Sequence, residues 1–284
     1  MRVDGETAVI PLRAMTAGEI LDAAVALLRR HAAPLLALSL TLAAVEQLML
    51  AQLRTFAALN PPLYYWRINS EDIDWVPVVA AGLASEAFII AMLGAVAGAA
   101  AGPALLGRRI GNRELFARVR PLPALLLAVT LAALTFGAAI AGFLGVIFVY
   151  GLAGLATVVL TVDRTANPFT AMGRAVGRAT RGGMRGALLR LLGYLVWLAI
   201  RLALGSGWVI AASTVTSVAG WTWWLDWAVP VAWAMANAVA YAALACLDAV
   251  LLLEIRVRTE GLDISVSRAR SLGRDPAAAL VVRR

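Results

Sequence analysis

The chain has 284 residues, of which 62% are apolar, and its mean hydropathy is +0.82. Soluble domains contain roughly 45–50% apolar residues, so this composition excludes an ordinary soluble fold and indicates an integral membrane protein. The single cysteine excludes a disulfide within the chain.

The basic residues are all arginine, and they give the chain a formal net charge of +8 and a pI near 10.8. Such a charge raises the question of a nucleic-acid partner. The arginines lie beside apolar stretches, however, and basic residues there mark the cytoplasmic side of a membrane. We therefore interpret the charge as a topology signal and expect no nucleic-acid partner. Arginine without lysine, together with the excess of alanine, indicates a bacterial protein from a GC-rich genome.

Residues 1–33 are expected to form a cytoplasmic N-terminus with one amphipathic helix. Charged and turn-forming residues fill this region, so it lacks the early apolar core of a signal peptide. Thr16 and Glu19 have the spacing of a capping box, which marks the start of a helix. Apolar residues from Ile20 to His31 then recur at helical spacing. This pattern predicts a helix that lies on the inner membrane surface.

Residues 34–253 are predicted to form an all-α domain of six transmembrane helices. A spanning helix needs about 20 apolar residues, and the charge-free stretch 122–162 is about twice that length. We therefore divide it into two helices joined by a tight turn between Gly142 and Gly145. The predicted spans are 34–53, 76–106, two within 122–162, 188–216 and 228–253. Residues 254–284 remain as a basic cytoplasmic tail, whose polar part after Gly261 is expected to be partly disordered.

The arginines between the spans alternate between the two sides of the membrane in a strongly unequal way. The segments on the side of both termini carry nearly all of them, whereas the opposite side holds only Arg54 and Arg67. The positive-inside rule then predicts cytoplasmic termini in a bacterial inner membrane. Aromatic residues gather in the outer loops, as interfacial anchors or, alternatively, as a substrate-facing surface: Tyr64, Tyr65, Trp66, Trp75, Trp221, Trp223, Trp224 and Trp227.

A basic segment precedes the fifth span. Asn167 and Pro168 are suited to the start of a helix. On one continuous helix, spacings of 4, 3 and 4 would place four arginines on a single stripe, suited to anionic lipid headgroups or to an acidic partner protein. The alternative is that they only enforce topology. These residues are Arg174, Arg178, Arg181 and Arg185.

Ionisable residues inside the spans are the strongest functional pointers, because each costs roughly 2.5–3.5 kcal/mol at a helix centre. Counting along the spans places one group near the midplane or slightly toward the outer leaflet, namely Glu46, Glu86, Arg201 and Asn237. A second group, Arg190 and Asp248, lies near the inner end. Arg201 can pair with either acid of the first group. These residues either line a path for a polar solute, a lipid headgroup or a proton, or satisfy one another and fix the helix register.

Catalytic and metal-binding signatures are missing from the sequence. His31 is the only histidine, and Cys246 lies in an apolar stretch, where packing is its expected role. A zinc site needs three or four ligands in one place, and a nucleophile needs an adjacent base. No glycine-rich nucleotide loop is present either. We therefore expect no enzymatic activity, no metal and no cofactor.

Both ends of the chain resemble a known family. The N-terminal segments PL (11–12), GEILDAA (18–24) and LRRH (28–31), and the closing segment RVRTEGLDI (256–264), are similar to the ends of actinobacterial proteins described as glycerophosphoryl diester phosphodiesterase membrane domain-like. Residues 171–190 resemble that family's segment before a late span. The resemblance implies a multi-span protein of undefined activity. The phosphodiesterase site itself requires paired histidines and several acids on a soluble barrel, and this chain lacks them.

The expected function is therefore that of a non-enzymatic accessory, scaffold or lipid-associated component of a membrane assembly. The alternative is the permease subunit of an exporter, which needs a separate ATPase as partner. A membrane-embedded hydrolase is the third and weakest hypothesis.

Overall fold

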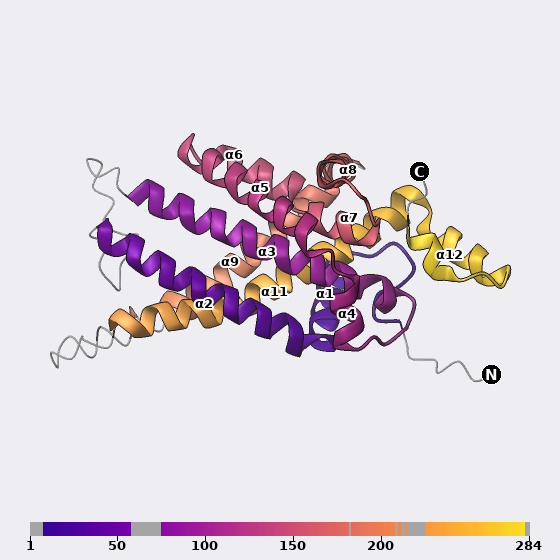
Figure 1. Ribbon diagram of the computed structural model, residues 1–284, viewed down its shortest axis with the longest axis horizontal. Helices are drawn as coiled ribbons and strands as arrows, with labels where there is room; N and C mark the ends of the chain where they lie inside the picture. Colours follow the sequence, from indigo (N-terminus) through magenta and orange to yellow (C-terminus); the bar gives the residue numbers. More distant parts are fainter. Residues whose placement is uncertain are drawn as a thin grey trace.

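The computed structural model describes residues 8–57, 75–181, 183–207, 210–211, 214 and 225–281, and over these residues it contains helices and no strands (Figure 1). Six segments are long and apolar enough to cross a membrane, which confirms the expected all-helical fold with six candidate spans. They are α2 (Ala32–Phe56), α3 (Trp75–Leu105), α5 (Pro121–Ile140), Leu144–Val162, Arg185–Gly207 and α11 (Leu225–Glu260).

The turn between the third and fourth spans lies where the glycines predicted it. Helix α5 ends at Ile140 and the next helix begins at Leu144. Gly142 and Phe143 have positive φ values of 126° and 64°. This backbone is unfavourable for a phenylalanine. The ring of Phe143 stacks against Trp75 of α3 at a centroid distance of 6.0 Å, a contact that favours this conformation.

The fourth and fifth spans are interrupted helices. The fourth consists of α6 (Leu144–Phe148), the π-helical turn η1 (Val149–Ala153) and α7 (Ala156–Val162). The fifth consists of α9 (Arg185–Leu202) and the π-helical turn η2 (Ala203–Gly207), and most of its predicted remainder lies outside the described residues. Single π-turns inside helices are rare and occur frequently at functional sites. Here both turns lie next to buried arginines of α9.

The end that we predicted for the last span, residue 253, lies inside a helix. Helix α11 has 36 residues and continues to Glu260. At 1.5 Å per residue it is about 54 Å long, well beyond the roughly 30 Å thickness of a hydrocarbon core. Its charged end stays helical because Glu254 and Glu260 form ion pairs with arginines from other segments, described below.

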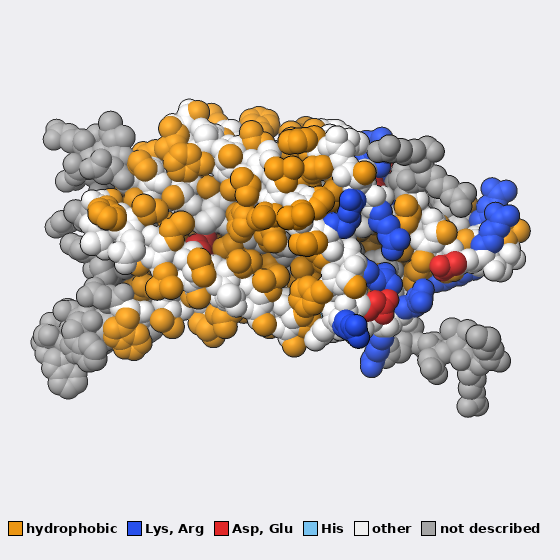
Figure 2. All heavy atoms as spheres, in the orientation of Figure 1, with side chains coloured by type: hydrophobic (Ala, Val, Ile, Leu, Met, Phe, Trp, Pro, Cys, Tyr) orange, Lys and Arg blue, Asp and Glu red, His pale blue; other side chains and the backbone are white. Residues whose placement is uncertain are grey.

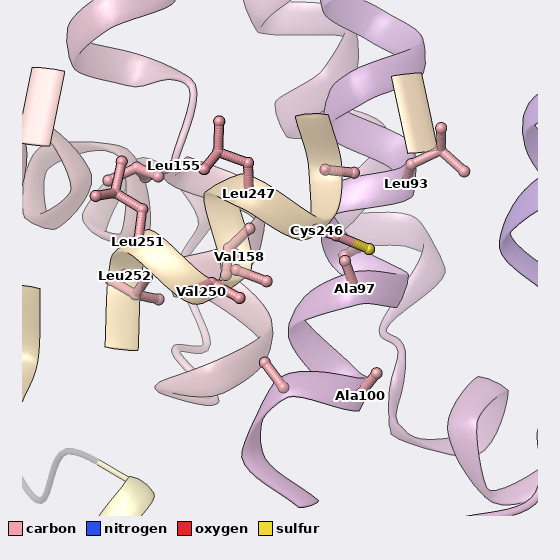
Figure 3. Close-up of a cluster of buried hydrophobic side chains, with 14 of the residues drawn as sticks. Leu93, Ala97, Ala100, Leu155, Val158, Cys246, Leu247, Val250, Leu251 and Leu252 are labelled. Atoms are coloured by element: carbon pink, nitrogen blue, oxygen red, sulfur yellow. The ribbon is translucent and has the colours of Figure 1, made fainter. Parts of the chain in front are cut away.

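Helix α11 is the central element of the fold. It packs against α1, α2, α3 and α9, and 94% of its most apolar stretch is buried, compared with 22% for the fifth span. Small residues let the helices approach closely, as Gly94 and Gly98 of α3 do where they contact α7. Figure 3 shows the resulting apolar cluster, with side chains from α3, α7 and α11: Leu93, Ala97, Ala100, Leu155, Val158, Cys246, Leu247, Val250, Leu251 and Leu252.

The surface divides into an apolar band and a charged end. Apolar side chains cover the long helices, and the arginines that are visible on this face gather at one end of the molecule (Figure 2). Exposed leucines and phenylalanines on α5, α6 and α9 contribute to this band, among them Leu122, Phe136, Phe148 and Leu195. In a bilayer these side chains face lipid. We call the end of the molecule where the arginines gather the arginine-rich end.

Four shorter helices and one 3-10 turn lie at the arginine-rich end (Figure 1). In α1, the predicted capping box between Thr16 and Glu19 is present, and hydrogen bonds from Arg13 and Thr16 lower the pKa of Glu19 to about 2. The apolar side of α1 is buried against α11, through residues such as Ile20 and Leu27. The elements are α1 (Ala17–Arg30), α4 (Asn112–Arg118), α8 (Pro168–Thr180), α12 (Leu262–Ser271) and η3 (Pro276–Leu280).

The segment after Gly261 is more ordered than its composition predicted. It forms α12, in which Leu262 and Val266 are buried, and then η3, whose first turn is capped by Asp275. The carbonyl oxygen of Leu280 accepts a hydrogen bond from Arg256 at 2.7 Å. The expectation of disorder is therefore wrong for residues 262–281, because a few apolar residues hold the segment against the spans.

The close approach of α3 to α7 can be tested at Gly98. A Cβ atom at this position would lie 3.3 Å from the Cα atom of Val158, so Gly98→Val should lower the free energy of unfolding by about 1–3 kcal/mol through overpacking. Gly137→Val in α5 is the matched control, because nothing lies within 4 Å of its Cβ position. Thermal unfolding in detergent micelles measures both. Equal losses of stability would contradict the packing described here.

Candidate functional site

The four polar residues that we predicted near the midplane lie together. Glu46, Glu86, Arg201 and Asn237 come from α2, α3, α9 and α11, and all four are buried. We call them the polar cluster. An Nη1 atom of Arg201 lies 3.0 Å from Oε2 of Glu86, so Arg201 pairs with the acid of α3 and not with that of α2.

Glu46 has neutral partners instead of an arginine. The hydroxyl group of Tyr241 donates to its two carboxylate oxygens at 2.9 and 3.1 Å. The amide of Asn237 donates at 3.1 Å and the hydroxyl group of Ser85 at 2.8 Å. Three helices therefore hold this carboxyl group in place. Buried charge is costly without such partners.

Two tyrosines belong to the site, although sequence reasoning missed them. The guanidinium of Arg201 lies 5.7 Å from the ring centre of Tyr194 and 5.2 Å from that of Tyr241, within the range of cation–π attraction. Helical spacing could have indicated both residues. Tyr194 precedes Arg201 by two turns, and Tyr241 follows Asn237 by four residues, so each shares a helix face with a member of the cluster.

The polar cluster lines a cavity of about 160 Å³. Apolar and aromatic side chains such as Leu198 and Trp233 complete its wall, together with Gln47 and Arg54 of α2. Three polar atoms of the cluster are buried and have no hydrogen-bond partner among the described residues: Oε1 of Glu86, Nε of Arg201 and Oδ1 of Asn237. Buried polar atoms in proteins are nearly always paired. The residues that carry these three atoms line the cavity.

The cavity lies in the half of the molecule away from the arginine-rich end. Between the apolar side chains that cover α2 and α3, an acidic side chain is visible from outside (Figure 2). The helices α2 and α3 supply both acids of the cluster.

The second predicted group forms a closed ion pair. Nε of Arg190 lies 2.7 Å from Oδ1 of Asp248, and Nη2 lies 3.1 Å from Oδ2. The same guanidinium donates to the backbone carbonyl of Tyr150, which belongs to the π-helical turn η1. Arg190 also fills the space beside Gly154, where any Cβ atom would collide with it. These contacts use three nitrogens of the Arg190 guanidinium and both carboxylate oxygens of Asp248.

The predicted arginine stripe does not exist as a single helix face. Helix α8 ends at Thr180 and α9 begins at Arg185, and the chain between them includes two positive φ values, at Gly183 and Met184. The assumption of one continuous helix was wrong. Each of the four arginines instead lies within 4 Å of a carboxylate of the chain: Arg174 and Arg178 near Asp163, Arg178 and Arg181 near Glu260, and Arg185 near Glu254.

Arg178 is the best-connected of these arginines. Its Nη1 atom donates to Asp163 at 2.7 Å and its Nε atom donates to Glu260 at 2.8 Å. Burial by itself lowers the pKa of Arg178, but the hydrogen bonds and charges of Glu260 and Asp163 outweigh this and raise the pKa above its usual value. Arg256 of α11 lies 3.5 Å from the other oxygen of Asp163. These contacts join α7, α8 and α11 at the arginine-rich end.

The other residues that the sequence singled out are the aromatic residues, His31 and Cys246. Of the predicted aromatic anchors, Trp75 lies against Phe143 and Trp227 is exposed, whereas Tyr64, Tyr65, Trp66, Trp221, Trp223 and Trp224 lie outside the described residues. His31 is buried between α1 and α2, and Cys246 is buried in the apolar cluster. In the described parts of the chain, no three His, Cys, Asp or Glu residues are grouped as a metal site would require.

Comparison of the chain with family models, with curated proteins and with solved structures finds no match.

If the ion pair of Arg190 and Asp248 is structural, single and double substitutions should change the stability of the protein in a specific pattern. Asp248→Leu alone should destabilise the protein by about 3–5 kcal/mol, because it leaves the guanidinium of Arg190 buried without its counter-ion. The double variant Arg190→Leu with Asp248→Leu should recover most of this loss. Thermal unfolding in detergent measures the cycle. If the double variant loses as much stability as the two single variants together, the two residues do not act only as each other's counter-ion.

Proposed function

We propose that this chain is a non-enzymatic, multi-pass protein of a bacterial cytoplasmic membrane that acts as a lipid-associated accessory component of a membrane assembly. In this proposal, the cavity at the polar cluster binds the headgroup of a lipid. The observation that carries the proposal is the set of buried, unpartnered atoms on Glu86, Arg201 and Asn237 around a cavity of about 160 Å³.

The chemistry of the cavity favours a headgroup with both donors and acceptors. Two carboxyl groups and two guanidinium groups line it, from Glu46, Glu86, Arg54 and Arg201, so it carries no large excess of one charge. The unpartnered oxygens accept hydrogen bonds from an amino or hydroxyl group, and Nε of Arg201 donates to a phosphodiester oxygen. A headgroup that joins an amine or a hydroxyl to a phosphodiester matches this set.

The position of the cavity supports a lipid over a water-soluble solute. It lies among the apolar helices, and an acidic side chain is visible from the side of α2 and α3 (Figure 2). A lipid can bring its headgroup there while its tails stay against apolar side chains such as Leu40, Val45 and Leu48, which are exposed on α2.

The proposed orientation rests on the charges. The arginines that are visible on the surface gather at one end, together with both ends of the described chain (Figures 1 and 2). By the positive-inside rule this end is cytoplasmic, so the cavity belongs to the outer half of the membrane. Helix α1 then lies at the inner surface with its apolar side against α11. Both ends of the chain resemble the family named in the sequence analysis, which also predicts a multi-span membrane protein. This resemblance stays a prediction.

The proposal predicts that Asn237→Ala reduces the amount of lipid that stays bound. Losing one hydrogen bond to a charged group costs about 1.5–3 kcal/mol, so retention should fall by about tenfold or more. Protein extracted from its native membrane into nanodiscs, followed by mass spectrometry of bound lipids, gives the measurement. Ser85→Ala is the matched control, because Ser85 also donates to Glu46 but does not line the cavity.

Two outcomes would contradict this proposal. If both variants retain lipid as the unchanged protein does, no headgroup uses the cavity. If a stoichiometric ATPase is purified with the protein and no lipid is retained, the chain is instead the permease subunit of an exporter, and the cavity belongs to its substrate path.

A further inference from the structure

A second cavity, separate from the polar cluster, lies at the arginine-rich end. It has a volume of about 70 Å³ and is lined by Arg108, Arg118 and Arg164, by small residues of α3 and by the C-terminal segment. A single water needs roughly 10–15 Å³ by the same kind of measure, so the cavity has room for a group as large as a phosphate.

Two of the three arginines of this cavity have no side-chain partner among the described residues. Among the described residues, Arg108 and Arg164 form no ion pair or side-chain hydrogen bond. Arg118 pairs with Glu114, but half of the glutamate side chain is exposed, and such pairs contribute little. The arginines of α8 differ, because each of them meets a carboxylate of the chain. Three guanidinium groups around one cavity repel each other unless an anion lies between them.

The backbone at Arg164 supports a role for its side chain. Arg164 follows the end of α7 and has a φ value of 52°, a left-handed conformation that glycine adopts without cost and arginine does not. Strained residues of this kind gather at binding sites. An arginine at this position places a guanidinium at the cavity in spite of the backbone preference.

The C-terminal segment forms part of the wall of this cavity. Leu280 lies against Gly102 of α3, where a Cβ atom would be 3.0 Å from its Cδ1 atom. Its carbonyl oxygen is held by Arg256. Ala277, Leu280 and Val281 thereby contribute to the wall of the cavity. The site is built from four separate segments of the chain, which is typical of a formed binding site and not of a random surface cluster.

We propose that Arg108, Arg118 and Arg164 bind a phosphate group in this cavity, carried by an anionic phospholipid or by a soluble phosphate ester. Guanidinium groups bind phosphate oxygens through paired, charge-assisted hydrogen bonds. The site is independent of the headgroup proposed for the polar cluster, since it lies at the other end of the spans and is lined by arginines without an acid.

Arg164→Gly tests the proposal, because glycine suits the left-handed backbone and the substitution removes the side chain that carries the guanidinium. The full-length protein is placed in nanodiscs of neutral lipid and titrated with glycerol phosphate, and separately in nanodiscs that contain phosphatidylglycerol. The shift in thermal unfolding reports binding in both arms. We expect stabilisation of the unchanged protein in at least one arm, which identifies the source of the phosphate. The variant should require about tenfold more ligand for the same shift.

Two controls separate binding from other effects. Met184→Gly relieves the same kind of backbone strain, at a φ value of 64°, and leaves the charge unchanged. Arg113→Gln removes an exposed arginine of α4 that does not line the cavity. Both controls should respond to the anion as the unchanged protein does. The proposal is overturned if Arg113→Gln and Arg164→Gly lose the response equally, or if neither phosphate source stabilises the unchanged protein.

Discussion

Inside a bilayer no water satisfies a polar side chain, so each one needs a partner from the protein itself. In this chain the constraint falls mainly on α11, which is enclosed by the other helices along most of its length. Each polar group of α11 fixes a neighbouring helix: Asn237 and Tyr241 bind Glu46 of α2, Asp248 binds Arg190 of α9, Glu254 binds Arg185, and Glu260 binds Arg178 of α8. These contacts fix the register of the bundle.

The two intramembrane groups meet this constraint in different ways. Arg190 and Asp248 use their hydrogen bonds on each other and on the backbone carbonyl of Tyr150, so they close the space between α9, α11 and the fourth span. The polar cluster leaves atoms of Glu86 and Arg201 unpartnered around a cavity. We therefore propose a structural role for Arg190 and Asp248 and ligand binding for the polar cluster.

The spans could be predicted because long apolar stretches are a strong signal. The intramembrane polar residues could be predicted because such residues are rare within these stretches. Few charges occur in apolar helices, so counting depth along each span placed Arg190 level with Asp248. The partners of Glu46 could not be predicted, because tyrosines in apolar helices are usually packing residues. The arginine stripe was wrong for a physical reason: helical spacing applies only to a continuous helix, and the chain turns at Gly183 and Met184. Its acidic partners, such as Asp163, lie far away in sequence or beyond a predicted span end.

The central claim is that the outer cavity holds part of a lipid, and an electron cryomicroscopy map of the protein in nanodiscs of its native lipids tests it most directly. The claim predicts headgroup density within hydrogen-bond distance of Glu86, Arg201 and Asn237, continuous with acyl chains that leave between α2 and α3. A map in which the four helices close around the polar cluster, with no density other than protein and water between them, would contradict it.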